Sequence, residues 1–188
     1  MIRTGLLLAA IIILIGGCGG MSPSVFIHDE YNFQYLERVA VVPFDNLSSD
    51  QGAGARASRI FISELLSERA FDVVEPGEVT KALEKYATVR TSQLTKEQII
   101  NIGKELKVQG IILGNVTEVS TFRSGASTTN TVTMVVSMVE TETGMTVWSA
   151  TNTSGKKGFF SSLFGTGDKS ESEAMRDCVK GTLKTLIK

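Results

Sequence analysis

The chain has 188 residues and a formal net charge of −1, and 42% of its residues are hydrophobic. This length and apolar content suit one domain with its own core, and the near-zero charge gives no basis for nucleic acid as a partner. Any histidine-based metal cluster or Ser-His-Asp triad would depend on His28, the single histidine, so we predict no metal site and no catalytic residues.

The first residues combine one positive charge with a short apolar run. Arg3 precedes an 11-residue apolar stretch, 5–15, which is short for a transmembrane helix of about 20 residues but fits the h-region of a signal peptide. The stretch leads into Leu-Ile-Gly-Gly-Cys at 14–18, which resembles a bacterial lipobox. We therefore predict a signal peptide at 1–17 and a Cys18 that carries diacylglycerol and an acyl chain. The alternative is a plain signal peptide followed by an ordinary buried cysteine.

The lipobox assignment divides the chain into three parts. The signal peptide is followed by a lipidated tether, 18–36, and by one periplasmic domain, 37–188. Gly19, in place of Asp, favours the outer membrane over the inner one by resemblance to Gram-negative sorting rules. Acylation of Cys18 leaves Cys178 without a disulfide partner, and its position in an amphipathic helix predicts that it is buried.

Periodicity and turn residues predict the elements of the domain. The predicted strands cover 38–44, 71–74, 108–119, 129–140 and 145–150, and the last two form a hairpin around Thr141–Gly144. Helices are predicted from Gly54 to about Ala70, around Val79–Tyr86, after a capping box of Thr95 and Gln98, and from about Ser170 to the end. Polar loops are predicted at 45–53 and 154–170.

The predicted order is β-α-β-α-α-β-β-β-α. The economical assembly is an α/β (α+β) fold in which helices pack on a single mixed sheet of about five strands.

Five stretches resemble the CsgG family of outer-membrane lipoproteins, in the order that the family shows. They read VAVVPFDN (39–46), FDVVE (71–75), GKELKVQGIILG (103–114), ETGMTVWS (142–149) and EAMRDCV (173–179). The resemblance implies a fold similar to the N-terminal domain of TolB, to LpoB and to PelC. It places the family's two transmembrane hairpins at 120–130 and 155–169, and both stretches are too short for two membrane-crossing strands of about 9–11 residues each plus a turn. We therefore expect a short form of the family that lacks these hairpins.

The resemblance implies a non-enzymatic subunit or accessory of an envelope secretion, export or assembly complex, anchored by lipid at the periplasmic face of the outer membrane. Its partners would be copies of itself or other envelope proteins. One alternative is an LpoB-like activator of a peptidoglycan synthase. A distant alternative is a nucleotide-binding periplasmic enzyme, because Gly52 and Gly54 match G-x-G-x-x-A between a strand and a helix, with Glu75 at the end of the next strand.

Large apolar residues in a polar loop are candidates for a partner or membrane contact. Phe159, Phe160, Leu163 and Phe164 follow Lys156-Lys157 in a loop rich in Gly and Ser, although the loop could equally fold back over the sheet. Trp148 has two interpretations as well. It either faces a neighbouring protein or, as we slightly favour, packs in the core against the last helix.

Overall fold

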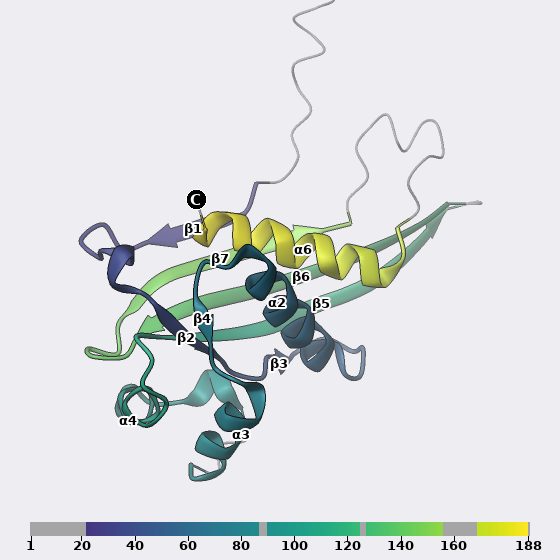
Figure 1. Ribbon diagram of the computed structural model, residues 1–188. Helices are drawn as coiled ribbons and strands as arrows, with labels where there is room; N and C mark the ends of the chain where they lie inside the picture. The colour runs from purple at the N-terminus through teal and green to yellow at the C-terminus, as the bar shows by residue number, and fades with distance from the viewer. Residues whose placement is uncertain (1–21, 87–89, 125–126, 156–168, 188) are drawn as a thin grey trace, which may run out of the picture.

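A mixed β-sheet runs through the whole molecule, and helices cover both of its faces (Figure 1). The computed structural model describes residues 22–86, 90–124, 127–155 and 169–187. The strands are β1 (Ser24–Ile27), β2 (Arg38–Val41), β3 (Asp45–Asn46), β4 (Asp72–Val73), β5 (Gly110–Ser124), β6 (Ser127–Glu140) and β7 (Thr146–Ser154). The helices are α2 (Ala53–Glu68), α3 (Pro76–Glu84), α4 (Lys96–Leu106) and α6 (Glu171–Leu186), with short 3₁₀ turns η1 (Phe33–Tyr35) and η2 (Thr91–Gln93).

Within these residues the strand order is β1-β7-β6-β5-β2-β4, and β3 pairs with β5 beyond the end of β2. One half of the sheet, from β1 to β5, is antiparallel. The other half is parallel, because β2 lies between β5 and β4 in the same direction as both. The predicted α/β fold with one mixed sheet is therefore confirmed, and the predicted order of helices and strands is present with two short strands added.

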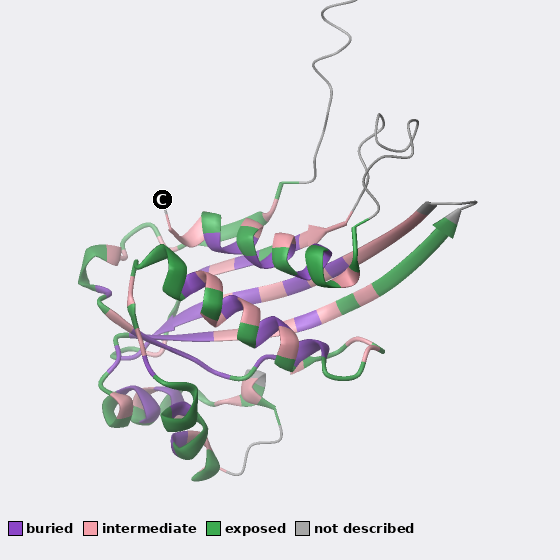
Figure 2. Cartoon of the chain, turned by 45° about the vertical axis from the view of Figure 1, so that its right-hand side comes forward, coloured by how far each residue is buried: buried purple, intermediate pink, exposed green. Residues whose placement is uncertain are grey.

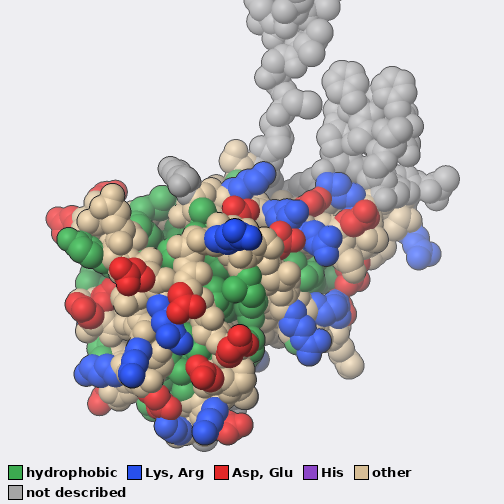
Figure 3. Space-filling view, in the orientation of Figure 1, with side chains coloured by type: hydrophobic (Ala, Val, Ile, Leu, Met, Phe, Trp, Pro, Cys, Tyr) green, Lys and Arg blue, Asp and Glu red, His purple; other side chains and the backbone are tan. Residues whose placement is uncertain are grey.

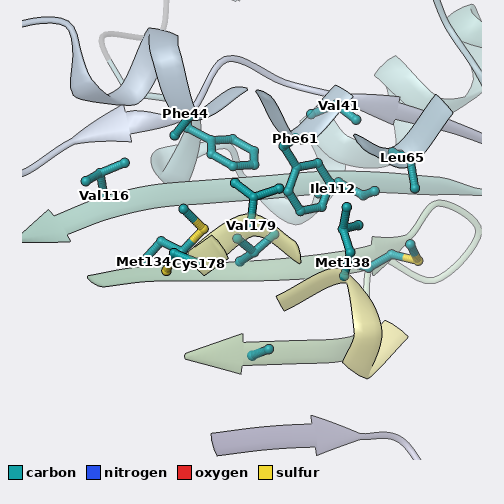
Figure 4. Packing of buried hydrophobic residues seen from close by; sticks show 14 of the residues in the cluster. Val41, Phe44, Phe61, Leu65, Ile112, Val116, Met134, Met138, Cys178 and Val179 are labelled. Carbon is teal, nitrogen blue, oxygen red and sulfur yellow. The ribbon is translucent and has the colours of Figure 1, made fainter. Parts of the chain in front are cut away.

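Each face of the sheet has its own core. On one face α2 and α6 bury the larger cluster, in which the ring centroids of Phe44 and Phe61 are 5.3 Å apart. Met134 and Met138 of β6 belong to the same cluster (Figure 4). On the other face α3 and α4 bury Ile99 and Ile102 against β2 and the start of β5. The antiparallel half therefore depends on α2 and α6 for its cover.

Helix α6 is attached to β7 by polar bonds inside the core. The Asn152 amide donates to the carbonyl of Cys178 at 2.8 Å, and the Cys178 thiol donates to the carbonyl of Asn152 at 3.3 Å. A Cβ on Gly181 would lie 2.5 Å from the Asn152 amide nitrogen, so only glycine permits this approach. Cys178 is buried as predicted, and desolvation raises the pKa of its thiol to about 12.

Three parts of the fold differ from the prediction. Residues 24–36, predicted as tether, belong to the domain: β1 pairs with β7, and Leu36 is buried. Pattern alone did not show β1 because its four residues do not alternate. The predicted loop at 45–53 begins with the two-residue strand β3. Segment 120–130, predicted as an insertion, is mostly the end of a β5–β6 hairpin that extends past the helices. At this end the residues of β5 are exposed and those of β6 are half-buried (Figure 2). Its polar residues gave no apolar alternation.

The start of α2 touches the backbone of the preceding strand connection. A Cβ on Gly54 would lie 2.4 Å from the carbonyl oxygen of Phe44, whereas one on Gly77 in α3 would meet nothing within 4 Å. Gly54→Ala should therefore lower the free energy of unfolding by about 1–3 kcal/mol through overpacking. The matched change Gly77→Ala should raise it by roughly 0.5–1 kcal/mol, because alanine loses less backbone entropy in a helix. Urea unfolding of the mature chain measures both, and equal effects of the two changes would contradict this packing.

Candidate functional site

An open groove with a volume of about 960 Å³ lies at the end of the sheet where β1 and β6 finish. Three segments line it: the connection between β1 and β2, the C-terminal part of α4, and the turn between β6 and β7. These segments are far apart in the sequence and meet only because β7 lies between β1 and β6 in the sheet.

Aromatic side chains from the β1–β2 connection form one side of the groove. Tyr31 stacks edge-to-face on Phe33 with 4.9 Å between ring centroids, while Tyr35 is 76% exposed at the rim. Met145, from the β6–β7 turn, is also exposed beside them. Exposed tyrosine offers a large contact area at low entropic cost, and methionine offers an adaptable one; both are enriched at protein-binding surfaces.

A buried carboxylate holds the β6–β7 turn in shape. Glu140 is 8% exposed and accepts hydrogen bonds from the backbone N–H of Glu142, from that of Thr143 at 2.9 Å, and from the Thr143 hydroxyl. Gly144 completes the turn with a φ of 66°, a conformation that favours glycine. These hydrogen bonds therefore fix the conformation of the turn that lines the groove.

Helix α4 approaches this turn so closely that only glycine fits between them. A Cβ on Gly103 would lie 2.4 Å from the Cβ of Thr141, whose hydroxyl donates to the carbonyl of Val108 at 2.6 Å. The helix begins at the predicted capping box, in which Thr95 and Gln98 bond each other's backbone. Capping and close packing together place Lys104 and Lys107 at the groove.

The charges around the groove are mixed in sign. Two lysines, Lys104 and Lys107, line it together with the carboxylates of Glu30 and Glu142. Desolvation, followed by the negative charges of Glu140 and Glu142, raises the pKa of Tyr31 above its ordinary value. Tyr31 therefore remains a neutral phenol, able to donate a hydrogen bond, at physiological pH.

The Nδ1 atom of His28 is buried and has no hydrogen-bond partner among the described residues, and such an atom is commonly satisfied by water or a bound group.

The predicted contact residues fall in different places. Cys18 and the loop residues Phe159, Phe160, Leu163 and Phe164 lie outside the described residues. Trp148 is fully buried, and its indole N–H donates to the Thr185 hydroxyl of α6 at 3.2 Å. The interpretation of Trp148 as a partner contact is therefore wrong, and its favoured placement in the core is correct. A bulge between Met138 and Val139 interrupts the alternation of β7 at this point, so that the adjacent residues Val147 and Trp148 are both buried.

The glycines of the G-x-G-x-x-A match have structural roles. Gly52 is the left-handed N-cap of α2 with a φ of 81°, and Gly54 faces the Phe44 carbonyl. Asp50 forms an ion pair with Arg56 at this helix start, and Arg56 also bonds Glu171 of α6 at 2.8 Å. A carboxylate and a backbone carbonyl thus lie where the phosphates of a dinucleotide would have to bind.

Among the described residues, no group of three or more His, Cys, Asp or Glu side chains could hold a metal ion, and no helix is long and apolar enough to cross a membrane.

The sequence model of one family, described as the peptidoglycan-synthase activator LpoB, matches residues 24–153. This match covers more than half of the chain and includes β1 and most of the groove, so the chain belongs to the LpoB family. LpoB was one of the fold relatives implied by the resemblance in the sequence, whereas membership of a CsgG family is not shown. No curated protein matches the sequence of the chain.

Two solved structures share the fold at low sequence identity. The PelC dodecamer from Paraburkholderia phytofirmans is similar with a TM-score of 0.56 and 16% identity, over 86% of this chain and 96% of PelC. Lipoprotein GNA1162 from Neisseria meningitidis is similar with a TM-score of 0.57 and 16% identity, over 80% of this chain and 97% of its own. Their coverage extends beyond the family match, so nearly the whole described chain belongs to one known fold.

The hydrogen bonds that Glu140 accepts in the β6–β7 turn can be tested by substitution. Glu140→Ala leaves the two N–H groups of Glu142 and Thr143 without their carboxylate partner and should lower the free energy of unfolding by about 1–3 kcal/mol. Glu142→Ala removes an exposed carboxylate from the same turn and should change it by less than about 0.5 kcal/mol. Urea unfolding with amide hydrogen exchange at Glu142 and Thr143 measures both, and unchanged exchange in Glu140→Ala would contradict the bonding.

Proposed function

We propose that this chain is a non-enzymatic lipoprotein that binds and activates a peptidoglycan synthase at the periplasmic face of the outer membrane. The match of residues 24–153 to the LpoB family carries this proposal, because that family is described as an activator and not as an enzyme. The groove supports it, since the exposed side chains of Tyr35 and Met145 line it at one end of the sheet and are available to a partner. In this proposal the acyl chains on Cys18 hold the protein to the membrane, and the partner fills the groove.

The groove provides the means to test the partner. The acylated chain should co-purify a peptidoglycan synthase from cross-linked envelopes and raise its rate of glycan synthesis when the two purified proteins are mixed. Tyr35→Ala should reduce both effects by roughly tenfold, the range for loss of one aromatic contact that becomes buried when the partner binds. Phe122→Ala, which removes a ring 69% exposed on the β5–β6 hairpin, is the matched control and should leave both unchanged. Equal activity of the two variants would exclude the groove as the binding site.

A second candidate is a subunit of an envelope export or assembly complex that forms a ring of identical chains. The similarity to PelC, which was crystallised as a dodecamer, favours it. In this case the acylated chain would form a discrete oligomer in light scattering, and the co-purified protein would belong to an export system and not to cell-wall synthesis. The identity of the captured partner therefore separates the two candidates.

Anchoring by Cys18 is tested by changing that residue alone. The Cys18→Ser variant, secreted with a cleavable non-lipoprotein signal peptide in place of residues 1–17, should appear in the soluble periplasmic fraction, because the loss of both acyl attachments removes the predicted anchor. Fractionation of membranes with antibody detection measures this. A Cys18→Ser chain that stays firmly bound to membranes would contradict the anchor and would direct attention to the apolar loop of Phe159, Phe160, Leu163 and Phe164, or to a partner.

A further inference from the structure

The two edges of the sheet are protected to very different degrees. The β4 edge is two residues long, and Asp72 on it pairs with Arg38 at 3.5 Å. The opposite edge is β1, whose residues Ser24, Val25, Phe26 and Ile27 carry no charge and no proline. Short length and charged side chains commonly prevent an edge strand from pairing with another chain. Of these two features, β1 has only the short length.

All four side chains of β1 are exposed. Val25 and Ile27 stand opposite Ala150 and Trp148 of β7 and so continue the face that α6 covers over β6 and β7. Phe26 points to the other face and is 50% exposed. Apolar side chains therefore line both sides of one edge of the molecule. By contrast, the face formed by α2 and α6 carries interspersed positive and negative side chains, as Figure 3 shows.

The position of β1 in the chain limits how far this edge can be from a lipid anchor. Only five residues lie between Cys18 and Ser24, and the six extended steps that join these two residues span at most about 20–22 Å. If Cys18 is acylated, β1 is held near the membrane surface. No lysine or arginine occurs between Cys18 and Glu37, so this stretch offers a membrane apolar side chains and no positive charge.

We infer that the β1 edge lies against the membrane, with Val25, Phe26 and Ile27 inserted at the boundary between headgroups and acyl chains. This inference rests on the proposed acylation of Cys18. At that depth, water and headgroups remain available to the backbone groups of β1 that do not face β7, which the hydrocarbon core would not provide. Because β1 leads directly into the groove at His28, a partner in the groove would be met close to the membrane.

A fluorescent label on the edge strand tests the contact. In the acylated chain with Phe26→Cys, an NBD maleimide reacts with the new thiol alone, because Cys18 is blocked by lipid and the Cys178 thiol is buried with a pKa of about 12. The matched control is Phe122→Cys, since Phe122 is also an exposed phenylalanine but lies on the β5–β6 hairpin, away from β1 (Figure 1). Emission of the buried Trp148 reports that each labelled chain is folded.

The labelled chains are bound to phosphatidylcholine vesicles. The label at position 26 should shift its emission to the blue, brighten several-fold and be quenched by doxyl-labelled lipids. The label at 122 should keep the emission that it has in water. Adding anionic lipid or salt should change neither, because the contact is apolar.

Three outcomes would overturn the inference. A chain that floats with the vesicles while its label at position 26 remains water-exposed would overturn the contact and leave the anchor intact. A chain that does not float would overturn the anchor and, with it, this inference. A label at 26 that becomes protected without vesicles in a Cys18→Ser chain, as the protein concentration rises, would show that a second copy covers β1 instead.

Discussion

The packing of α6 across β6 and β7 is the contact on which the rest of the structure depends. It buries Trp148, and the paired bonds between Asn152 and Cys178 set the position of β7. Strand β7 in turn provides the ladder to which β1 adds. Without α6 the antiparallel half would lose the main cover of its apolar face, and neither the β1 edge nor the groove beside it would have a fixed position. The functional surfaces proposed here therefore lie far in sequence from the helix that maintains them.

The proposed membrane contact and the proposed partner site are neighbours: the first is the β1 edge of the sheet, and the second is the groove at the end where β1 finishes. The β1 edge is apolar and uncharged, which suits lipid, whereas the groove that begins at His28 combines tyrosines with lysines and glutamates, which suits a protein surface. The change in chemistry occurs within a few residues of the chain. An anchored protein with this arrangement would present its partner site at a fixed short distance from the membrane, in contrast to a domain carried on a long flexible linker.

Much of the domain was predictable because its elements have strong local patterns. The capping box at Thr95, the alternation in β6 and the apolar spacing of α6 all predicted elements that the structure contains. Strands β1 and β3 were missed because four and two residues carry no periodicity, and the outer β5–β6 hairpin because its polar residues form a backbone ladder without a buried face. The groove could not be predicted, since its residues come from three separate segments. Its nearest local signal was the cluster of Tyr31, Phe33 and Tyr35.

The sequence by itself determined the class of fold and the burial of Cys178, because each depends on local spacing, and one short motif predicts the anchor at Cys18. The tertiary structure alone decided the role of Trp148, the use of Gly54 as a packing position and the extension of the domain into residues 24–36. These depend on which distant segment lies opposite each residue. It also decided that an uncharged strand six residues after Cys18 lies at the edge of the sheet. The physical reason is that an edge strand is defined by having a neighbouring strand on one side only. Which strands are its neighbours depends on the packing of the whole domain and not on the residues of the strand itself.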